Sequence, residues 1–263
     1  MRHIRLLHAV VLSAACFSCS VPEPSARLVA PNPNARPIDQ LSLSVNACGP
    51  AALLNAFSAG SEPWQKVAEA VPGKSDRDRL AYIIKRYALH PSKHFRDQRR
   101  WSRRGGIGAI DLADMATEMA AAGGKLSGIR SESFVDTRNA PAALLRRLHR
   151  RLATSLKRGL PPILVLKRMA RPKSGATTAW TMVEGHYVVV TSLPARLLRS
   201  TTAFDIDCID PNGGQHRHAT IHTSSDPSIP WLLIDCPGTP VGQRRLRSGQ
   251  ISHLSASAVI GRF

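Results

Sequence analysis

The chain has 263 residues, with 36 Lys and Arg against 18 Asp and Glu, which gives a formal net charge of +18 at pH 7. This length is enough to bury a sizeable core in one large or two small domains, and the charge predicts attraction to polyanions such as acidic lipid or anionic cell-envelope polymer. Aromatic residues make up only 5% of the chain and form no base-stacking pattern, which argues against specific nucleic-acid binding.

Residues 1–19 are typical of an export signal. Arg2 and Arg5 precede a short apolar run, and small residues precede Cys16. The end of this stretch resembles a bacterial lipoprotein signal, in which the cysteine becomes the lipidated N-terminus, although Ser13 stands where an apolar residue is usual. Lipidation at Cys16, simple cleavage after a small residue and a retained segment all stay open. The signal predicts an extracytoplasmic protein that is periplasmic, membrane-anchored or secreted.

Residues 20–37 carry five prolines among small and polar residues, and this composition predicts an extended linker. A single folded domain is therefore expected over residues 38–263. Beyond the signal, no hydrophobic stretch of the sequence approaches the ~20 residues that a membrane-spanning helix needs.

The first notable stretch of this domain is residues 45–57, where Cys48 stands at the point at which a loop becomes an apolar helix. The unpaired N–H groups and the positive dipole end of a helix favour a thiolate over a thiol. Cys48 is therefore a candidate nucleophile. The structural alternative is a small cysteine that is merely buried at a helix start.

Helical patterns continue through the first half of the chain, at residues 63–71, 76–88, 110–122 and 139–157. Between the second and third of these, residues 90–108 carry six Lys and Arg around Phe95 and Trp101. This basic segment is either a loop that grips an anion or a solvated connection between helices.

Strand patterns fill the second half, at residues 163–166, 186–193, 203–209, 217–223 and 231–236, separated by clusters of Pro, Gly and Ser. Residues 254–260 either add an edge strand or remain without regular structure. Helices followed by strands predict an α+β domain in which helices pack on an antiparallel sheet.

Two residues of the strand half complement Cys48. His186 is expected to open a buried strand, and Asp210 follows the next strand directly before a Pro-Asn-Gly-Gly turn. An aspartate before such a turn also has a purely structural explanation, because Asp caps turns well. Together with the histidine, however, it is suited to hold an imidazole in one tautomer.

These motifs, Cys-Gly-Pro-Ala at Cys48, Gly-His-Tyr-Val-Val-Val at His186 and Asp-Pro-Asn-Gly-Gly at Asp210, occur in an order that resembles the papain-like cysteine peptidases. The likeness is greatest to the branch that cleaves double-glycine leader peptides in bacteriocin exporters, and it spans about residues 38–223. It implies a papain-like α+β fold with Cys48 as nucleophile, His186 as general base and acid, and Asp210 as the residue that orients the imidazole. It implies a peptide or protein substrate and no cofactor.

The sequence departs from this family at the oxyanion hole, the set of donors that stabilises the tetrahedral intermediate. The family usually carries a glutamine six residues before the nucleophile, where this chain has Ser42. Gln40 and Asn46 are the two candidates for that role, and the backbone N–H of Cys48 is expected to contribute with either.

Two further groups of residues allow other interpretations. Cys208 and Cys236 lie in strand-like runs of an exported chain, so they are able to form a disulfide that leaves Cys48 as the free thiol. Three histidines share one face of a predicted strand, but exposed histidines on a basic hairpin are the simpler explanation than a metal site, and no metal ligand is assigned. These histidines are His216, His218 and His222.

The sequence thus predicts an exported thiol-dependent amide hydrolase, with a peptide or protein as substrate. The alternatives are a papain-like acyltransferase, an envelope peptide-binding protein without proteolysis, and a basic protein that binds an anionic envelope polymer or membrane surface.

Overall fold

The computed structural model describes residues 26–124, 126–135, 140–173 and 179–263. The predicted signal, with Cys16 and Cys19, lies outside the described residues. Within them, no helix is both long enough and apolar enough to cross a membrane.

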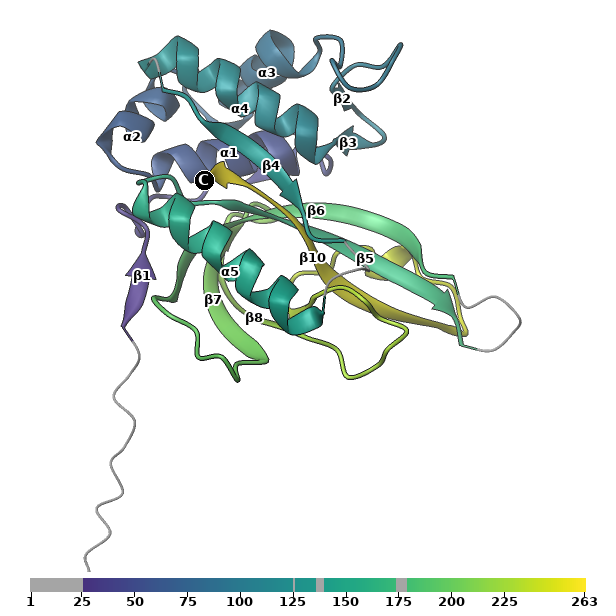
Figure 1. Ribbon diagram of the computed structural model, residues 1–263. Coiled ribbons are helices and arrows are strands. Elements are labelled where there is room, and N and C mark those ends of the chain that lie inside the picture. The colour runs from purple at the N-terminus through teal and green to yellow at the C-terminus, as the bar shows by residue number, and fades with distance from the viewer. Residues whose placement is uncertain (1–25, 125, 136–139, 174–178) are drawn as a thin grey trace, which may run out of the picture.

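Four of the α-helices form one layer (Figure 1), and α5 lies apart from them along the sheet. The helix α3 continues into a π-helical turn over Ile84–Ala88. A short 3-10 turn, Gln40–Ser42, precedes α1. The helices are α1 (Cys48–Ser58), α2 (Glu62–Glu69), α3 (Asp76–Ile83), α4 (Ala109–Gly124) and α5 (Pro141–Lys157).

Local sequence explains these helices. The whole of α1 except its last residue is buried, because apolar residues surround its axis. The start of α3 has a capping box, in which Ser75 and Asp78 exchange hydrogen bonds with each other's backbone. One face of α5 carries a leucine stripe, whose members Leu144, Leu148 and Leu152 are fully buried. The predicted helices are therefore present, with ends shifted by a few residues.

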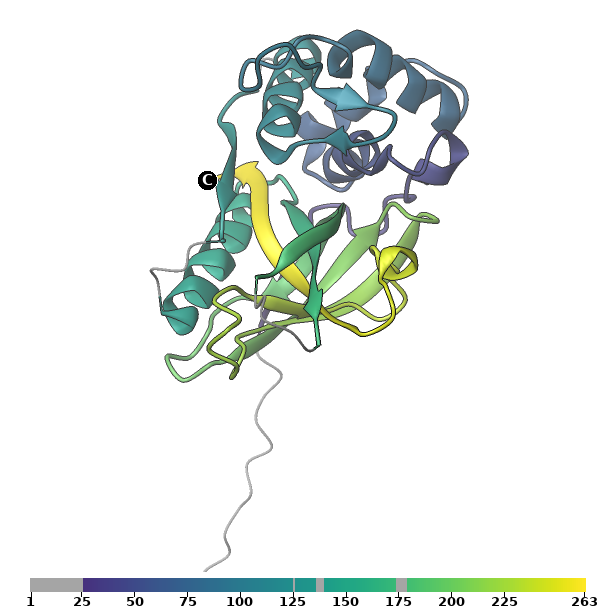
Figure 2. The ribbon, with the colours of Figure 1, turned by 90° about the vertical axis from the view of Figure 1, so that its right-hand side faces the viewer.

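The strands form a large antiparallel sheet that closes on itself, because β6 pairs with both β5 and β7. The order around this ring is β6, β5, β10, β9, β8 and β7, and β1 and β4 add to β6 and β10. Figure 2 shows the curved sheet on one side of the helical layer. The strands are β1 (Arg27–Val29), β4 (Ile129–Ser133), β5 (Ile163–Pro172), β6 (Thr181–Pro194), β7 (Ala203–Asp210), β8 (Gln215–His222), β9 (Leu233–Asp235) and β10 (Gln250–Arg262).

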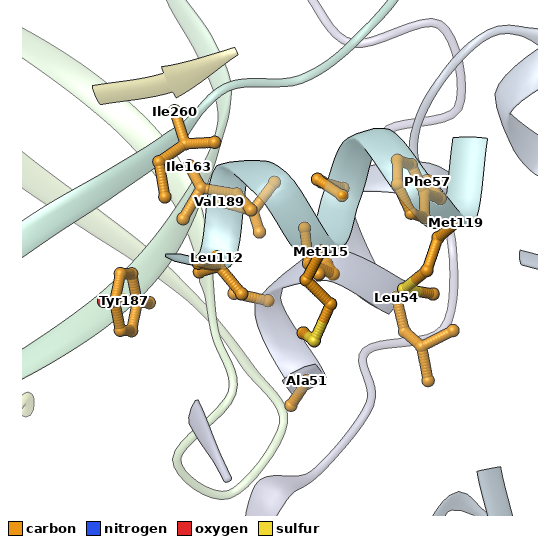
Figure 3. Close-up of a cluster of buried hydrophobic side chains, with 14 of the residues drawn as sticks. Ala51, Leu54, Phe57, Leu112, Met115, Met119, Ile163, Tyr187, Val189 and Ile260 are labelled. Carbon is orange, nitrogen blue, oxygen red and sulfur yellow. The ribbon is translucent and has the colours of Figure 1, made fainter. Parts of the chain in front are cut away.

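The two faces of the sheet bury different cores. Tyr187 and Val189 of β6 face the layer of α1 and α4, and Figure 3 shows these side chains beside Leu112 and Met115 of α4. Val188 alternates with them along the strand, so it points to the opposite face of the sheet. There it packs into a second core inside the ring, to which the leucines of α5 also belong. A strand with both faces buried holds its side chains rigidly, and β6 carries a candidate catalytic residue.

The α+β class is thus confirmed, and several expectations about strands are corrected. β10 is a central strand rather than an edge strand or a loose end, since it pairs with β5 along most of its length and with β4 and β9 on its other side. β6 begins at Thr181, so His186 lies within the strand and does not open it. β1 pairs with β6, so residues 27–29 of the expected linker belong to the sheet. The sequence patterns do not predict β4.

Candidate active site

Cys48 is the first residue of α1, and its side chain is 7% exposed at a cavity between the helical layer and the sheet. The residue before it, Ala47, has no side chain able to cap the helix. The first N–H groups of a helix have no partner within it, so they remain available to a negative charge at this point. Pro50 suits the first turn because its missing N–H would have no helical partner there.

His186 and Asp210 lie on the same face of the paired strands β6 and β7. The imidazole Nε2 is 2.7 Å from Asp210 Oδ1, and the aspartate is fully buried. Asp210 is the last residue of β7, so the strand fixes its backbone while the turn after it supplies an N–H donor from Asn212 at 2.9 Å. The structure therefore joins the predicted histidine and aspartate in one hydrogen-bonded pair.

The second carboxylate oxygen of Asp210 is also bonded. Thr239 Oγ1 donates to Asp210 Oδ2 at 2.8 Å, and this hydroxyl in turn lies 3.2 Å from Cys236 Sγ. The sequence alone does not identify Thr239. It stands in a loop after β9 and far from the three motifs, and no local pattern marks it.

The pKa values of this pair follow from burial and from its neighbours. Burial alone would lower the pKa of His186, but the hydrogen bond to Asp210 and the nearby Cys48 sulfur raise it to about 10. Burial would raise the pKa of Asp210, whereas the hydrogen bond from His186 lowers it. His186 thus carries a proton at neutral pH between a carboxylate and a sulfur. The three predicted residues are brought together.

The cavity beside Cys48 has a volume of about 640 Å³. Both Cys48 and His186 line it, together with residues of β4, β5 and β10 and the start of α4. Tyr187 closes one side, and its hydroxyl donates to the Ile107 carbonyl at 2.6 Å; burial raises the pKa of this tyrosine, so it remains a neutral donor. This volume lies within the range of about 300–1,000 Å³ that is usual for ligand-binding sites.

The two candidates for the oxyanion hole have different surroundings. Asn46 lines the cavity, but its side-chain NH₂ already donates to the carbonyls of Arg103 (2.7 Å) and Arg104 (3.3 Å). Gln40 is buried, its backbone N–H donates to Pro211, and its side-chain nitrogen donates to the Val45 carbonyl at 2.7 Å. The side-chain oxygen of Gln40 has no partner among the described residues.

The basic segment, residues 90–108, lies beside the cavity rather than only connecting two helices. It contains the short hairpin of β2 (Trp101–Ser102) and β3 (Gly106–Ile107). Asn46 holds this segment, since its side chain bonds the loop and its carbonyl accepts from Trp101 Nε1 at 2.9 Å. The hairpin is therefore tied directly to the residues that precede Cys48.

The remaining sequence candidates have other partners. The three histidines of β8 are spread along the strand; His218 lies 3.0 Å from Asp207 and His222 lies 3.2 Å from Asp235. Among the described residues, no group of three metal-ligating side chains is present. His216 lies on β8 and is exposed, as the sequence predicts.

Cys208 and Cys236 are buried neighbours with free thiols in this structure. Both lie in the core cluster inside the ring, where Cys208 lowers the pKa of Cys236 and Cys236 raises the pKa of Cys208. The prediction that these cysteines adjoin is confirmed, while the structure contains them in reduced form.

Comparison of the chain with family models, with curated proteins and with solved structures finds no match. The function of the chain is therefore inferred from the arrangement of the site itself.

Proposed function

We propose that this protein is a papain-like thiol hydrolase that cleaves an amide bond of a peptide through a thioester on Cys48. The observation that carries the proposal is the assembly of a helix-terminal cysteine and a histidine at one cavity, with a buried aspartate hydrogen-bonded to the histidine. Nucleophile, base and orienting acid within reach of one another are the arrangement that covalent acyl transfer requires.

In the first half of the reaction, the Cys48 thiolate attacks the carbonyl carbon of the scissile amide, and the carbonyl oxygen becomes an oxyanion. His186 then gives its proton to the amide nitrogen, so the amine leaves and a thioester remains. Asp210 keeps the imidazole oriented through the 2.7 Å contact to Nε2, which leaves Nδ1 for the sulfur side.

In the second half, neutral His186 takes a proton from water, and the resulting hydroxide attacks the thioester. The carbonyl–sulfur bond breaks, the acid product leaves and the thiolate–imidazolium pair is restored. The N-terminal N–H groups of α1 are the donors best placed for the oxyanion of both steps. Both candidate side chains already donate elsewhere, Gln40 to the Val45 carbonyl and Asn46 to those of Arg103 and Arg104, so neither is assigned to the oxyanion.

The first experiment measures the reactivity of Cys48 with iodoacetamide at mildly acidic pH, with detection by mass spectrometry. An ordinary thiol of pKa ~8.5 is almost fully protonated there and reacts slowly. We expect selective alkylation of Cys48, and a strong reduction of its rate in His186→Ala. Cys208, a buried thiol whose pKa is raised, is the internal control within the same chain. A Cys48 that reacts no faster than Cys208 would contradict the proposal.

The second experiment separates hydrolysis from the alternatives that share the site. Peptide mixtures incubated in ¹⁸O-labelled water should yield a new carboxyl group carrying the label, and Cys48→Ala should abolish that product. An acyltransferase would instead form a new amide when a primary amine is added. A protein that only binds peptides would form neither product, and its binding would survive Cys48→Ala.

A further inference from the structure

We propose that the substrate segment bound in the cavity is acidic, and that Lys167 with Arg99 and Arg103 recognises its carboxylates. This inference rests on the proposed peptidase function and names the substrate class of the same site. It derives from the balance of charge along the cavity and not from the net charge of the chain.

Lys167 lines the same cavity as Cys48 and His186. It lies on β5 opposite Gly185 and is half-buried. No described residue forms an ion pair with it. The acid that lines the same cavity, Glu132, is already engaged by Arg147 at 2.6 Å and Arg151 at 2.5 Å.

A second cavity of about 790 Å³ lies along the basic segment. Phe95, Gly105, Gly106 and Gly108 line both cavities, so the two adjoin at the hairpin. The second cavity is lined by the exposed side chains of Arg99 and Arg103.

The other two charged residues that line the second cavity, Arg100 and Asp111, are buried and hydrogen-bonded within the protein. Arg100 is buried and makes two hydrogen bonds of 2.7 Å to Glu118, and Asp111 accepts from the Ser92 hydroxyl at 2.8 Å. Arg99 and Arg103 form no ion pair with any described residue. Glu132 is thus paired with two arginines and Asp111 is buried, whereas Lys167, Arg99 and Arg103 have no ion-pair partner among the described residues.

The uncharged surface around these cations defines the rest of the ligand. Phe95, Ile110 and Met182 line the first cavity and are 47%, 40% and 59% exposed. A peptide that places apolar side chains against these residues and carboxylates against the cations would satisfy both. A basic peptide would meet unpaired like charges at Lys167 and is therefore disfavoured.

The test uses three peptidyl acyloxymethyl ketones that alkylate an active-site thiol and differ only in having Glu, Gln or Lys at the variable positions. The quantity measured is the second-order rate constant for labelling Cys48. We expect the Glu probe to react about fivefold faster than the Gln probe, as for one partly exposed ion pair, and the Lys probe to be slowest. Lys167→Glu should reverse this order.

Two further variants make the test specific. Lys173→Glu changes the same charge just beyond β5, at an exposed residue that lines neither cavity, and should preserve the order. The double variant Arg99→Glu, Arg103→Glu alters exposed side chains and should weaken the preference for Glu independently of Lys167.

The outcomes distinguish the two proposals. Equal rates for the three probes would overturn the acidic-substrate inference while leaving the peptidase proposal intact. A second outcome also overturns the acidic-substrate inference. If the three probes react at equal rates, and an added anionic polysaccharide lowers all three rates by the same factor, the cations bind an envelope polymer instead. Failure of every peptide probe to label a Cys48 that iodoacetamide does label would overturn both.

Discussion

Asp210 is the residue whose surroundings decide how well His186 is held. Both of its carboxylate oxygens are bonded, one to the imidazole and to the Asn212 N–H, the other to the Thr239 hydroxyl. A fully buried carboxylate that lost one of these donors would be partly unsatisfied, and it would be free to rotate away from the imidazole. Thr239 is therefore a positioning residue for the proposed reaction.

Replacement of Thr239 by Val should lower kcat by about tenfold or more, since a hydrogen bond to a charged group is worth about 1.5–3 kcal/mol. Thr239→Ser keeps the hydroxyl and should retain most of the activity. The alkaline limit of the pH–rate profile, set by His186 near pH 10, should move to lower pH in the Val variant. An unchanged profile would mean that Thr239 serves packing alone.

A functional residue can be predicted from the sequence when both its type and its neighbours in the chain suit the same role. Cys48 at a helix start, His186 on a buried strand and Asp210 before a turn each carry a local signal, and the structure brings them together. Thr239 and Lys167 carry none, because their importance depends on which strands become neighbours. Which strands become neighbours is decided by the tertiary structure, and the spacing of residues along the chain does not reveal it.

At the scale of elements, the contact between α1 and α4 fixes the position of the thiol. Gly49, next to Cys48, lies so close to Ile107 that an added Cβ would overlap its side chain, and it would also reach Leu112 at 3.4 Å. The absence of a side chain at Gly49 therefore allows α1 to approach both the hairpin and α4.

Gly49→Ala should lower the free energy of unfolding by about 1–3 kcal/mol, as overpacking in a closed core does. It should also slow alkylation of Cys48, because the start of α1 must shift. The matched control is Gly108→Ala, where the new Cβ would meet only Phe95, at 3.8 Å. Urea unfolding and iodoacetamide labelling of both variants provide the comparison, and equal stability of the two would argue against the close contact.

The helices are predicted well because their apolar residues recur at helical spacing over several turns. The strands are predicted less completely. β10 buries Ser255 and Ser257, and the Ser257 hydroxyl donates to the Val165 carbonyl at 3.1 Å, so small polar residues occupy core positions there. A pattern of hydrophobic and polar residues does not identify such a strand as central.

At the scale of the whole molecule, His186 makes stability depend on pH. Its pKa is raised from 6.5 to about 10 on folding, so the folded protein binds its proton more tightly than the unfolded chain does. The resulting stabilisation is fully present below pH 6.5 and is lost as the pH rises through about 10.

The measurement is urea unfolding of the wild type and of His186→Gln in buffers from pH 6.5 to pH 10. The wild type should lose stability with rising pH more steeply than the variant, which lacks the titrating group. Other groups that titrate in this range, such as the Cys208–Cys236 pair, are common to both proteins and cancel in the difference. Parallel curves would show that the proton on His186 does not contribute.

The central position of β10 has a consequence for how the molecule comes to be made. A ribosome or an export channel delivers the chain from its N-terminal end, so this strand emerges after every other described element. Until it arrives, β5 and β9 are each paired on one side only, and the ring that supports His186 and Asp210 stays open. If Cys48 is the nucleophile of the proposed reaction, its thiol is synthesised long before this ring closes, and the site is completed only when β10 has been added.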